Sequence, residues 1–286
     1  MARGRRDELG GSRMFRVVQV SDTHLSASKP HFASNWEPTV AWIRAQRPDL
    51  VVHTGDVTVD GADLEDDLSH CAGLMRGIGV PFLAVPGNHD VGDAGNRHQP
   101  IDDARIARWN RHFGADRWVR DVPGWRLVGI DALLFGSGHP QEAAQAEWLV
   151  RAMEEAQGRR IAWFLHRPLF LEGPDEPDTG YWSVKPAQRR FYMDLVARHR
   201  VSLVSSGHLH KSNLFERDGT TYAWCPSAGF VVGPKEQPPM PGQARIGALS
   251  IELSNPSARV SIAEIPGTAA YVIDDVIHEV YPPRGG

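Results

Sequence analysis

Aspartate, histidine and asparagine residues recur in this sequence directly after apolar segments, in a pattern that could bind metal ions. The apolar segment Phe15–Val20 is followed by SDTHL, residues 49–53 by TGDVTVDG, and residues 81–85 by PGNHD. Two later apolar segments end in HRP and in GHLHK. Imidazole, carboxylate and amide oxygen together suit first-row divalent cations, and the absence of thiolates argues against a structural zinc site. The residues we expect at this site are Asp22, His24, Asp56, Asn88, His89, His166, His208 and His210.

Two cations can share such a set of ligands, because one carboxylate can bridge both ions and leave positions open for water and substrate. Two cations about 3.5–4 Å apart acidify a bridging water and hold a phosphoryl group, so the predicted chemistry is phosphoester hydrolysis. We expect Gly55, Gly87 and Gly207 to permit sharp turns beside these ligands. Each motif alone is also typical of an ordinary turn, and the chain has 13 histidines. The prediction therefore depends on their joint occurrence after successive apolar segments.

The apolar segments alternate with amphipathic ones, which indicates an α/β fold. Because the carboxyl ends of parallel strands lie along one edge of a sheet, five strand ends would bring the polar residues to one crevice. After Gly207 the pattern is strand-rich without helices, and it predicts a β meander. We expect strands at 15–20, 49–53, 81–85, 125–131, 160–166, 201–207, 220–227, 244–253 and 258–265, and helices at 36–46, 62–78, 101–113, 140–158 and 186–199.

Length, charge and cysteine content limit the class of protein. The 286 residues, 41% of them hydrophobic, suffice for one large domain. The net charge of −4 argues against a stable nucleic-acid partner and against a DNA nuclease. No apolar run could serve as a transmembrane segment, no secretory signal is recognisable, and two cysteines make no disulfide framework. These features favour a cytoplasmic protein.

The chain ends differ from the rest of the sequence. Residues 1–13 are basic and glycine-rich, and we expect a disordered tail there. A single domain is expected at 14–265, followed by a C-terminal extension at 266–286. That extension alternates weakly and could add a strand or contact a second subunit, so a homodimer is left open.

Two further segments could approach a substrate. The loop 171–186 is long and polar, as loops that cover a site often are. Its Tyr181 and Trp182 either stack on a substrate base or pack the loop down. Arg111 and His112 could approach a phosphate, but we expect them to belong to an ordinary solvated helix face.

The ordered series DTH, GD, GNHD, H and GHLH resembles the calcineurin-like metallophosphoesterase superfamily, and within it the bacterial class III cyclic-nucleotide phosphodiesterases. The resemblance covers about residues 15 to 265. It implies a four-layer α/β/β/α sandwich and a dinuclear centre; Mn, Fe and Zn all tolerate such ligands. It further implies that Asp22, His24 and His210 bind one ion, that Asn88, His166 and His208 bind the other, and that Asp56 bridges them. His89 would bind no metal and would donate a proton to the leaving oxygen or stabilise the transition state.

Two departures from this superfamily tilt against a protein phosphatase. Its phosphatases have an aspartate three residues after the bridging one, and that residue orients the histidine. Val59 stands there in this chain, and the nearest carboxylate is Asp60, which is equally well a surface or turn residue. The arginine-rich phosphate-binding set of those phosphatases also has no obvious counterpart.

The leading hypothesis is a phosphodiesterase that acts on a small phosphoester substrate, with a 3′,5′-cyclic nucleotide such as cAMP as first candidate. The reaction would be attack by a metal-bridging hydroxide, with His89 as general acid. One alternative is hydrolysis of another nucleotide or phospholipid-derived ester, including a phosphomonoester. Another is a non-catalytic metal-binding scaffold, which a missing ligand or a missing His89 would favour; neither is missing.

Overall fold

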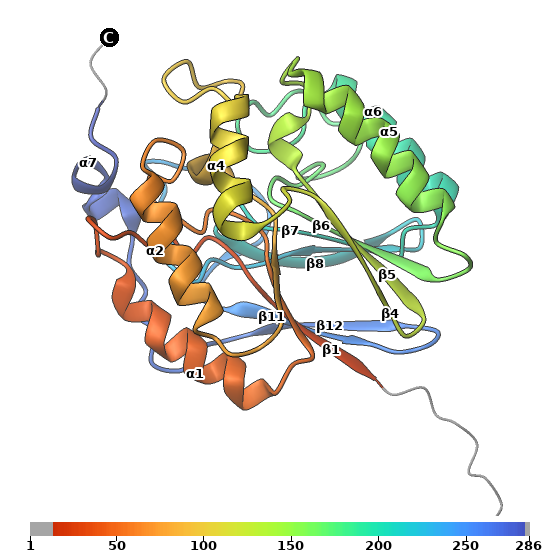
Figure 1. The fold of residues 1–286 in the computed structure, drawn as a ribbon, viewed down its shortest axis with the longest axis horizontal. Helices are drawn as coiled ribbons and strands as arrows, with labels where there is room; N and C mark the ends of the chain where they lie inside the picture. The colour runs from red at the N-terminus through yellow and green to blue at the C-terminus, as the bar shows by residue number, and fades with distance from the viewer. Residues whose placement is uncertain (1–13, 284–286) are drawn as a thin grey trace, which may run out of the picture.

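Two β-sheets lie face to face in the computed structural model, which describes residues 14–283 of the chain. Helices cover the outer face of each sheet (Figure 1). The predicted four-layer α/β/β/α sandwich is therefore confirmed. The tail predicted at 1–13 lies outside the described residues.

The first sheet carries the N-terminal strands and has the order β12-β11-β1-β2-β3. Its β1, β2 and β3 run parallel, and β11 pairs antiparallel with β1. The strands are β1 (Phe15–Val20), β2 (Leu50–His53), β3 (Phe82–Ala84), β11 (Ala248–Leu253) and β12 (Ala258–Ala263).

The second sheet has the order β10-β8-β9-β7-β6-β5-β4, and its four strands β5, β6, β7 and β9 run parallel. The predicted β meander is wrong, because β8, β9 and β10 extend this sheet whereas β11 and β12 join the first one. The apolar face of β11, with Leu249 and Ile251, packs between the two sheets. This burial explains why the chain passes from the second sheet to the first after β10. The strands are β4 (Trp118–Val122), β5 (Trp125–Ile130), β6 (Arg160–Leu165), β7 (Leu203–Ser206), β8 (Lys211–Arg217), β9 (Thr220–Trp224) and β10 (Gln243–Ala244).

Helices form the two outer layers, and α1 and α2 lie on the opposite side of the molecule from α5 and α6 (Figure 1). Among residues 14–283, no helix is both long and apolar enough to cross a bilayer. The α-helices are α1 (Trp36–Gln46), α2 (Glu65–Arg76), α3 (Asn88–Val91), α4 (Asp103–Phe113), α5 (Pro140–Glu154), α6 (Pro186–His199) and α7 (Ile277–Val280), and 3₁₀ turns lie at Ala33–Asn35, Ala132–Leu134 and Ile273–Asp275.

Three apolar clusters separate the four layers. Side chains alternate along a strand, so Val17 of β1 faces the space between the sheets and Val18 faces the helices. Leu127 and Val128 of β5 alternate in the same way. Full burial of one such side chain contributes about 1.5–3 kcal/mol, so strands that are buried on both faces hold the scaffold firmly. The rigid strands end where the predicted metal residues begin.

Candidate metal centre

All eight predicted site residues come together, at the carboxyl ends of strands from both sheets. The loops after β1 and β2 are joined by main-chain hydrogen bonds, from Asp22 N to Gly55 O (3.0 Å) and from His24 N to Asp56 O (3.1 Å). The loops after β6 and β7 are joined in the same way, from Gly207 N to His166 O (2.9 Å). One sheet edge would not gather all five loops; the stacking of two sheets does.

The three glycines of the site are required for two different reasons. Gly55 has φ +90°, as a sharp turn demands. Gly87 and Gly207 lack a positive φ but lie against neighbouring loops: Gly87 against the main chain and side chain of Asp56, and Gly207 against the side chains of Ser21 and Asp22. A Cβ on Gly87 would lie 2.2 Å from Asp56 Oδ1, and one on Gly207 would lie 1.9 Å from Ser21 Oγ. The turn prediction therefore holds for Gly55, whereas close approach explains the other two.

Five of the eight residues have positive φ, between 43° and 71°. For a residue other than glycine this left-handed conformation costs about 1–3 kcal/mol, and it persists only where the surrounding structure enforces it. Strain of this kind concentrates at functional sites. The five residues are Asp22, His24, Asp56, His208 and His210.

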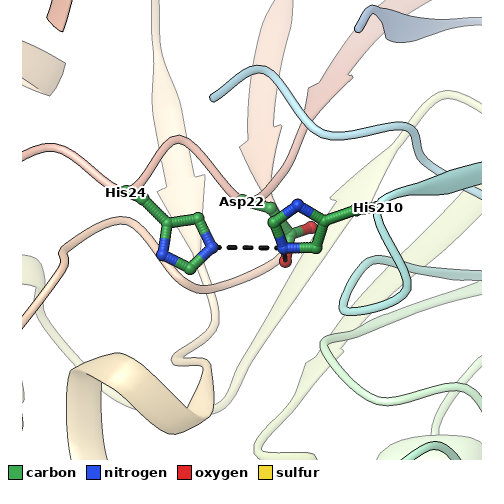
Figure 2. Close-up of side chains that lie close together, drawn as sticks. All are labelled: Asp22, His24 and His210. Atoms are coloured by element: carbon green, nitrogen blue, oxygen red, sulfur yellow. Dashed lines mark hydrogen bonds and ion pairs between the residues drawn. The ribbon is translucent and has the colours of Figure 1, made fainter. Parts of the chain in front are cut away.

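Asp22, His24 and His210 form one group, which we call the His24 half. Their ligand atoms all lie within 4.8 Å of one another. His24 Nε2 lies 3.3 Å from His210 Nε2, the contact dashed in Figure 2, and His210 Nε2 lies 3.4 Å from Asp22 Oδ1. Burial raises the pKa of Asp22 to about 7. A cation bound here would therefore replace a proton on a buried carboxyl group.

Asn88, His166 and His208 form a second group, the His166 half. His166 Nε2 lies 3.2 Å from Asn88 Oδ1 and 3.1 Å from His208 Nδ1. Both histidines are buried. An amide oxygen and two imidazole nitrogens thus converge on one point.

Asp56 lies between the two halves. Its Oδ2 is 3.2 Å from His166 Nε2 and 3.9 Å from His24 Nε2. Its Oδ1 accepts a hydrogen bond from the main-chain N–H of His89 (2.8 Å). Among residues 14–283, the Asp56 carboxylate is the acidic group that belongs to a cluster on each side, one with His24 and His89 and one with His166 and His208. This is the placement that a bridging carboxylate needs.

The outward hydrogen bonds of the histidines show that their inward nitrogens are free to bind a cation. His166 Nδ1 faces Thr54 O (2.7 Å), His208 Nε2 faces Tyr181 O (2.9 Å) and His210 Nδ1 faces Phe230 O (2.7 Å). Because a carbonyl only accepts, each of these nitrogens carries the N–H, and the other nitrogen presents a lone pair. Two lone pairs 3.1 Å apart, as in the His166 half, require a proton or a cation between them. The donor set therefore fits a metal ion in each half.

The electrostatics favour the metal-binding form of these side chains, with His166 as the exception. Burial lowers the pKa of His24 and His208 well below the usual value and that of His210 to about 4. Burial alone would raise the pKa of Asp56, but His166 and the neighbouring histidines hold it well below the usual range. Burial alone would lower the pKa of His166, but Asp56 raises it to about 9, so a cation bound in the His166 half would have to displace a proton from this ring. Neutral imidazoles beside an ionised carboxylate are the states that bind divalent cations.

His89 lies beside Asp56 at the edge of the cluster. Its Nδ1 is 3.2 Å from the main-chain carbonyl oxygen of Val59. This carbonyl takes the place of the aspartate side chain that we expected to orient the histidine in the phosphatases of the superfamily. The Asp60 carboxylate forms an ion pair with Lys29 Nζ (2.5 Å). His89 could itself reach a cation shared with His24 and Asp56, because their ligand atoms lie within 4.8 Å.

Asp90 and Arg167 contribute to the site and were not predicted. Asp90 is buried and accepts hydrogen bonds from Thr58 Oγ1 (2.7 Å) and from the main-chain N–H groups of Gly87, Val57 and Thr58, which ties two ligand loops together. The final residue of the GNHD motif was the available signal. Arg167 follows His166, pairs with Asp93 (2.5 Å) and lines a cavity beside Asn88.

Tyr281 was also missed, because nothing in the local pattern of the C-terminal extension indicates a site residue. Its Oη lies 2.7 Å from His24 Nδ1, and its ring lies 4.6 Å from the His89 ring, centroid to centroid. Burial raises the pKa of Tyr281 well above its usual value, so the phenol is neutral. The extension therefore contacts the site of its own chain.

The loop 171–186 covers the His166 half. Tyr181 Oη accepts a hydrogen bond from Asn88 Nδ2 (3.1 Å), and the Tyr181 ring lies 4.5 Å from that of His208. Trp182 packs edge-on against Tyr181 at 5.0 Å. Buried Arg189 of α6 fixes the loop by donating to three of its carbonyls. Packing of the loop is thus observed, and Tyr181 still borders the cavity beside Asn88.

Arg111 and His112 lie apart from this cluster in their interactions. Both bind Glu65 of α2, at 3.0 Å each. The interpretation as a solvated helix face is confirmed.

Comparison with known proteins agrees with this geometry. The family model described as Calcineurin-like phosphoesterase matches residues 15–212. The chain is 32% identical over 168 residues to the "3′,5′-cyclic adenosine monophosphate phosphodiesterase CpdA" of Escherichia coli K12. The matched segment covers 55% of this chain and 57% of that protein. It is 27% identical over 206 residues to the "Probable glycerophosphodiester phosphodiesterase GpdQ" of Arcobacter nitrofigilis, which covers 68% of this chain and 71% of that protein.

A solved structure supports the fold. The purple acid phosphatase PPD1 from yellow lupin is similar with a TM-score of 0.66 and 14% identity, over 91% of this chain and 53% of that one. At this identity the likeness concerns the fold alone. The family match, in contrast, extends over more than half of the chain and includes all eight site residues. The chain therefore belongs to the calcineurin-like phosphoesterase family.

Proposed function

We propose that this chain is a dinuclear metal-dependent phosphodiesterase that acts on 3′,5′-cyclic nucleotides, with cAMP as first candidate. The observation that carries the proposal is the placement of Asp56 between the His24 half and the His166 half, with His89 beside it. Asp22, His24 and His210 would hold one divalent ion, Asn88, His166 and His208 the other, and Asp56 both. Ions of Mn, Fe or Zn would supply Lewis acidity toward the phosphoryl oxygens and lower the pKa of bound water.

His89 is the proposed general acid. Its Nδ1 is turned to the Val59 carbonyl, so in the protonated ring Nε2 is left to donate a proton to the leaving oxygen. After that transfer the neutral ring keeps its Nδ1 proton and the same hydrogen bond. The orientation of the donor therefore stays fixed through the reaction. An acid of this kind typically contributes about 10²–10⁴-fold to the rate.

Two hollows meet at His89, as a diester with substituents on both sides of phosphorus would require. A cavity of about 540 Å³ lies on one side and a smaller one of about 360 Å³ on the other, and His89, Asn96 and Gln99 line both. The larger cavity has the size of a small-molecule site and is bordered by the aromatic rings of Phe135 and Tyr181. These rings support a nucleoside as the organic group.

A second candidate substrate is favoured by the cations of the larger cavity. Arg97 and Lys185 line it, and within residues 14–283 neither side chain forms an ion pair. They would suit a phospholipid-derived ester or another nucleotide with a second anionic group. The similarity to the protein named as a glycerophosphodiester phosphodiesterase points in the same direction. A cytoplasmic location and a homodimer stay predictions.

The test is turnover by Mn²⁺-loaded protein of 3′,5′-cAMP, bis-p-nitrophenyl phosphate, glycerophosphoserine and p-nitrophenyl phosphate, each repeated with a chelator. Chelator-sensitive cleavage of cAMP and the synthetic diester, with little cleavage of the monoester, would support the proposal. Preference for glycerophosphoserine, whose carboxylate is a second anionic group, would select the second candidate, and cleavage of the monoester alone would indicate a phosphatase. No turnover of any substrate by protein with both ions bound would support the scaffold hypothesis.

A further inference from the structure

The four buried histidines of the two halves differ in what holds their outward nitrogen. Main-chain carbonyls hold three of them, those of His166, His208 and His210. The outward Nδ1 of His24 meets a side chain instead, the Tyr281 hydroxyl at 2.7 Å. His24 Nε2 points toward His210 and Asp56, so a cation held among them would leave the N–H of the neutral His24 ring on Nδ1, where it can donate to Tyr281 Oη.

Several contacts hold Tyr281 in this place. The tail segment, residues 266–283, packs its Ile273 and Val280 into an apolar cluster with Phe32 and Phe230. Lys29 Nζ donates to the carbonyl oxygen of Val280 at 2.6 Å, one residue before the tyrosine. The segment is thus fixed on both sides of its short helix α7.

The tail segment is also held before α7, at Val272 and Asp274. The Asp274 carboxylate accepts hydrogen bonds from the main-chain N–H groups of Gly233 (2.8 Å) and Lys235 (3.1 Å). Val272 forms a β-bridge with Val231. These main-chain contacts leave Tyr281 little freedom to move away from His24.

The tyrosine ring also contacts the proposed general acid. Its centroid lies 4.6 Å from that of His89 and 6.3 Å from that of His24. The His24 ring is enclosed on another side by Phe230, at 4.5 Å. The Tyr281 hydroxyl therefore contacts the outward nitrogen of one predicted ligand, and the Tyr281 ring limits the space available to His89.

We propose that Tyr281 is a positioning residue for the His24 half: it holds the proton of His24 on Nδ1 and so directs the Nε2 lone pair at the cation. This rests on the proposed function only in taking His24 as a metal ligand. Loss of such an outer hydrogen-bond partner typically weakens metal binding about 10–100-fold. The effect should fall on one ion, because the His166 half has its own main-chain partners.

The test is calorimetric titration of Mn²⁺ into the metal-free full-length chain, as wild type and as Tyr281→Phe. The phenylalanine keeps the ring and removes only the hydroxyl. We expect one binding step to weaken about 10–100-fold and the other to stay unchanged. Tyr271→Phe is the matched control, because Tyr271 belongs to the same segment and bonds to Ser34 Oγ (2.7 Å), outside the ligand set.

Three results would overturn the inference: unchanged binding in Tyr281→Phe, equal weakening of both steps, or the same loss in Tyr271→Phe. The last two would indicate general loosening of the tail segment. The titration measures no turnover, so it separates this inference from the proposed activity. A wild type that binds two ions without hydrolysing any substrate would contradict the activity alone, whereas a wild type that binds none would contradict the ligand role of His24 and the inference with it.

Discussion

The two halves of the site have similar ligands but are held in different ways. In the His166 half, the main chain holds both histidines through the carbonyls of Thr54 and Tyr181. In the His24 half, a main-chain carbonyl holds His210, but a hydroxyl from the far end of the chain holds His24. A side-chain substitution cannot remove a main-chain carbonyl. The His166 half should therefore tolerate substitution of its outer partners, whereas the His24 half should depend on one side chain.

The segments that cover the two halves, the loop 171–186 and the tail segment, also differ in how firmly they are held. The loop over the His166 half is fixed by buried Arg189, which donates to several of its carbonyls, and by Glu176, which accepts hydrogen bonds from the main chain of the loop. The tail segment over the His24 half is held by one apolar cluster, by Asp274 and Lys29, and by buried Asn35, which bonds to the main chain of Ala269. The first cover belongs to the core of the domain, and the second is added to it late in the chain.

Substitution of Asp56 by asparagine should have the largest effect, because it removes the one charge that both halves share. We expect both Mn²⁺ binding steps to weaken beyond the 10–100-fold that is typical of an outer partner. Calorimetric titration measures this, with Glu65→Gln as a control on the solvated helix face. Selective loss of a single ion would show that Asp56 serves only one half.

Substitution of His89 by alanine should reduce turnover of cAMP about 10²–10⁴-fold. The loss should be much smaller for bis-p-nitrophenyl phosphate, because nitrophenolate leaves without a proton. Both Mn²⁺ binding steps should persist if His89 is an acid. A parallel loss of one ion would instead make His89 a ligand together with His24 and Asp56, and an equal loss on both substrates would remove the acid role.

Substitution of Tyr181 by phenylalanine should have a smaller effect than Tyr281→Phe, and this sharpens the contrast between the halves. It removes the acceptor for Asn88 Nδ2 but leaves the main-chain carbonyl that holds His208. We expect one Mn²⁺ step to weaken by less than about tenfold, at the low end for an outer partner. A hundredfold loss here would show that side chains position both halves alike.

Substitution of Arg111 by alanine should have the smallest effect. Its ion pair with Glu65 is exposed to solvent, so it contributes little to the free energy of unfolding. Turnover and Mn²⁺ binding should match the wild type. A clear fall in turnover, with unfolding unchanged, would assign this helix face a role in substrate binding.

Much of the fold and the ligand set was predictable because both depend on local pattern. Helices α1 and α6 have the predicted bounds. Six of the eight site residues follow strands that are largely buried on both faces, and Asn88 and His89 follow the partly buried apolar strand β3. Strands β4 and β8 were missed, because WVRDV and KSNLFER expose polar side chains near the sheet edge and lack an apolar run. Local pattern suffices where burial sets the residue types.

The remainder depends on contacts between distant parts of the chain. Tyr281 meets a ligand 257 residues earlier in the sequence, and no periodicity within the tail segment encodes that contact. The division of the C-terminal strands between two sheets likewise depends on which faces pack together, not on strand propensity. The His24 half is therefore the part of the site that sequence patterns describe least completely.

The most direct measurement is the electron paramagnetic resonance spectrum of the full-length chain loaded with Mn²⁺. If the two halves each hold one ion and share Asp56, the spectrum should show an exchange-coupled pair, and titration should reach two ions per chain. The coupling should disappear in Asp56→Asn. A wild-type spectrum of isolated Mn²⁺, or saturation at a single ion, would contradict the shared dinuclear centre.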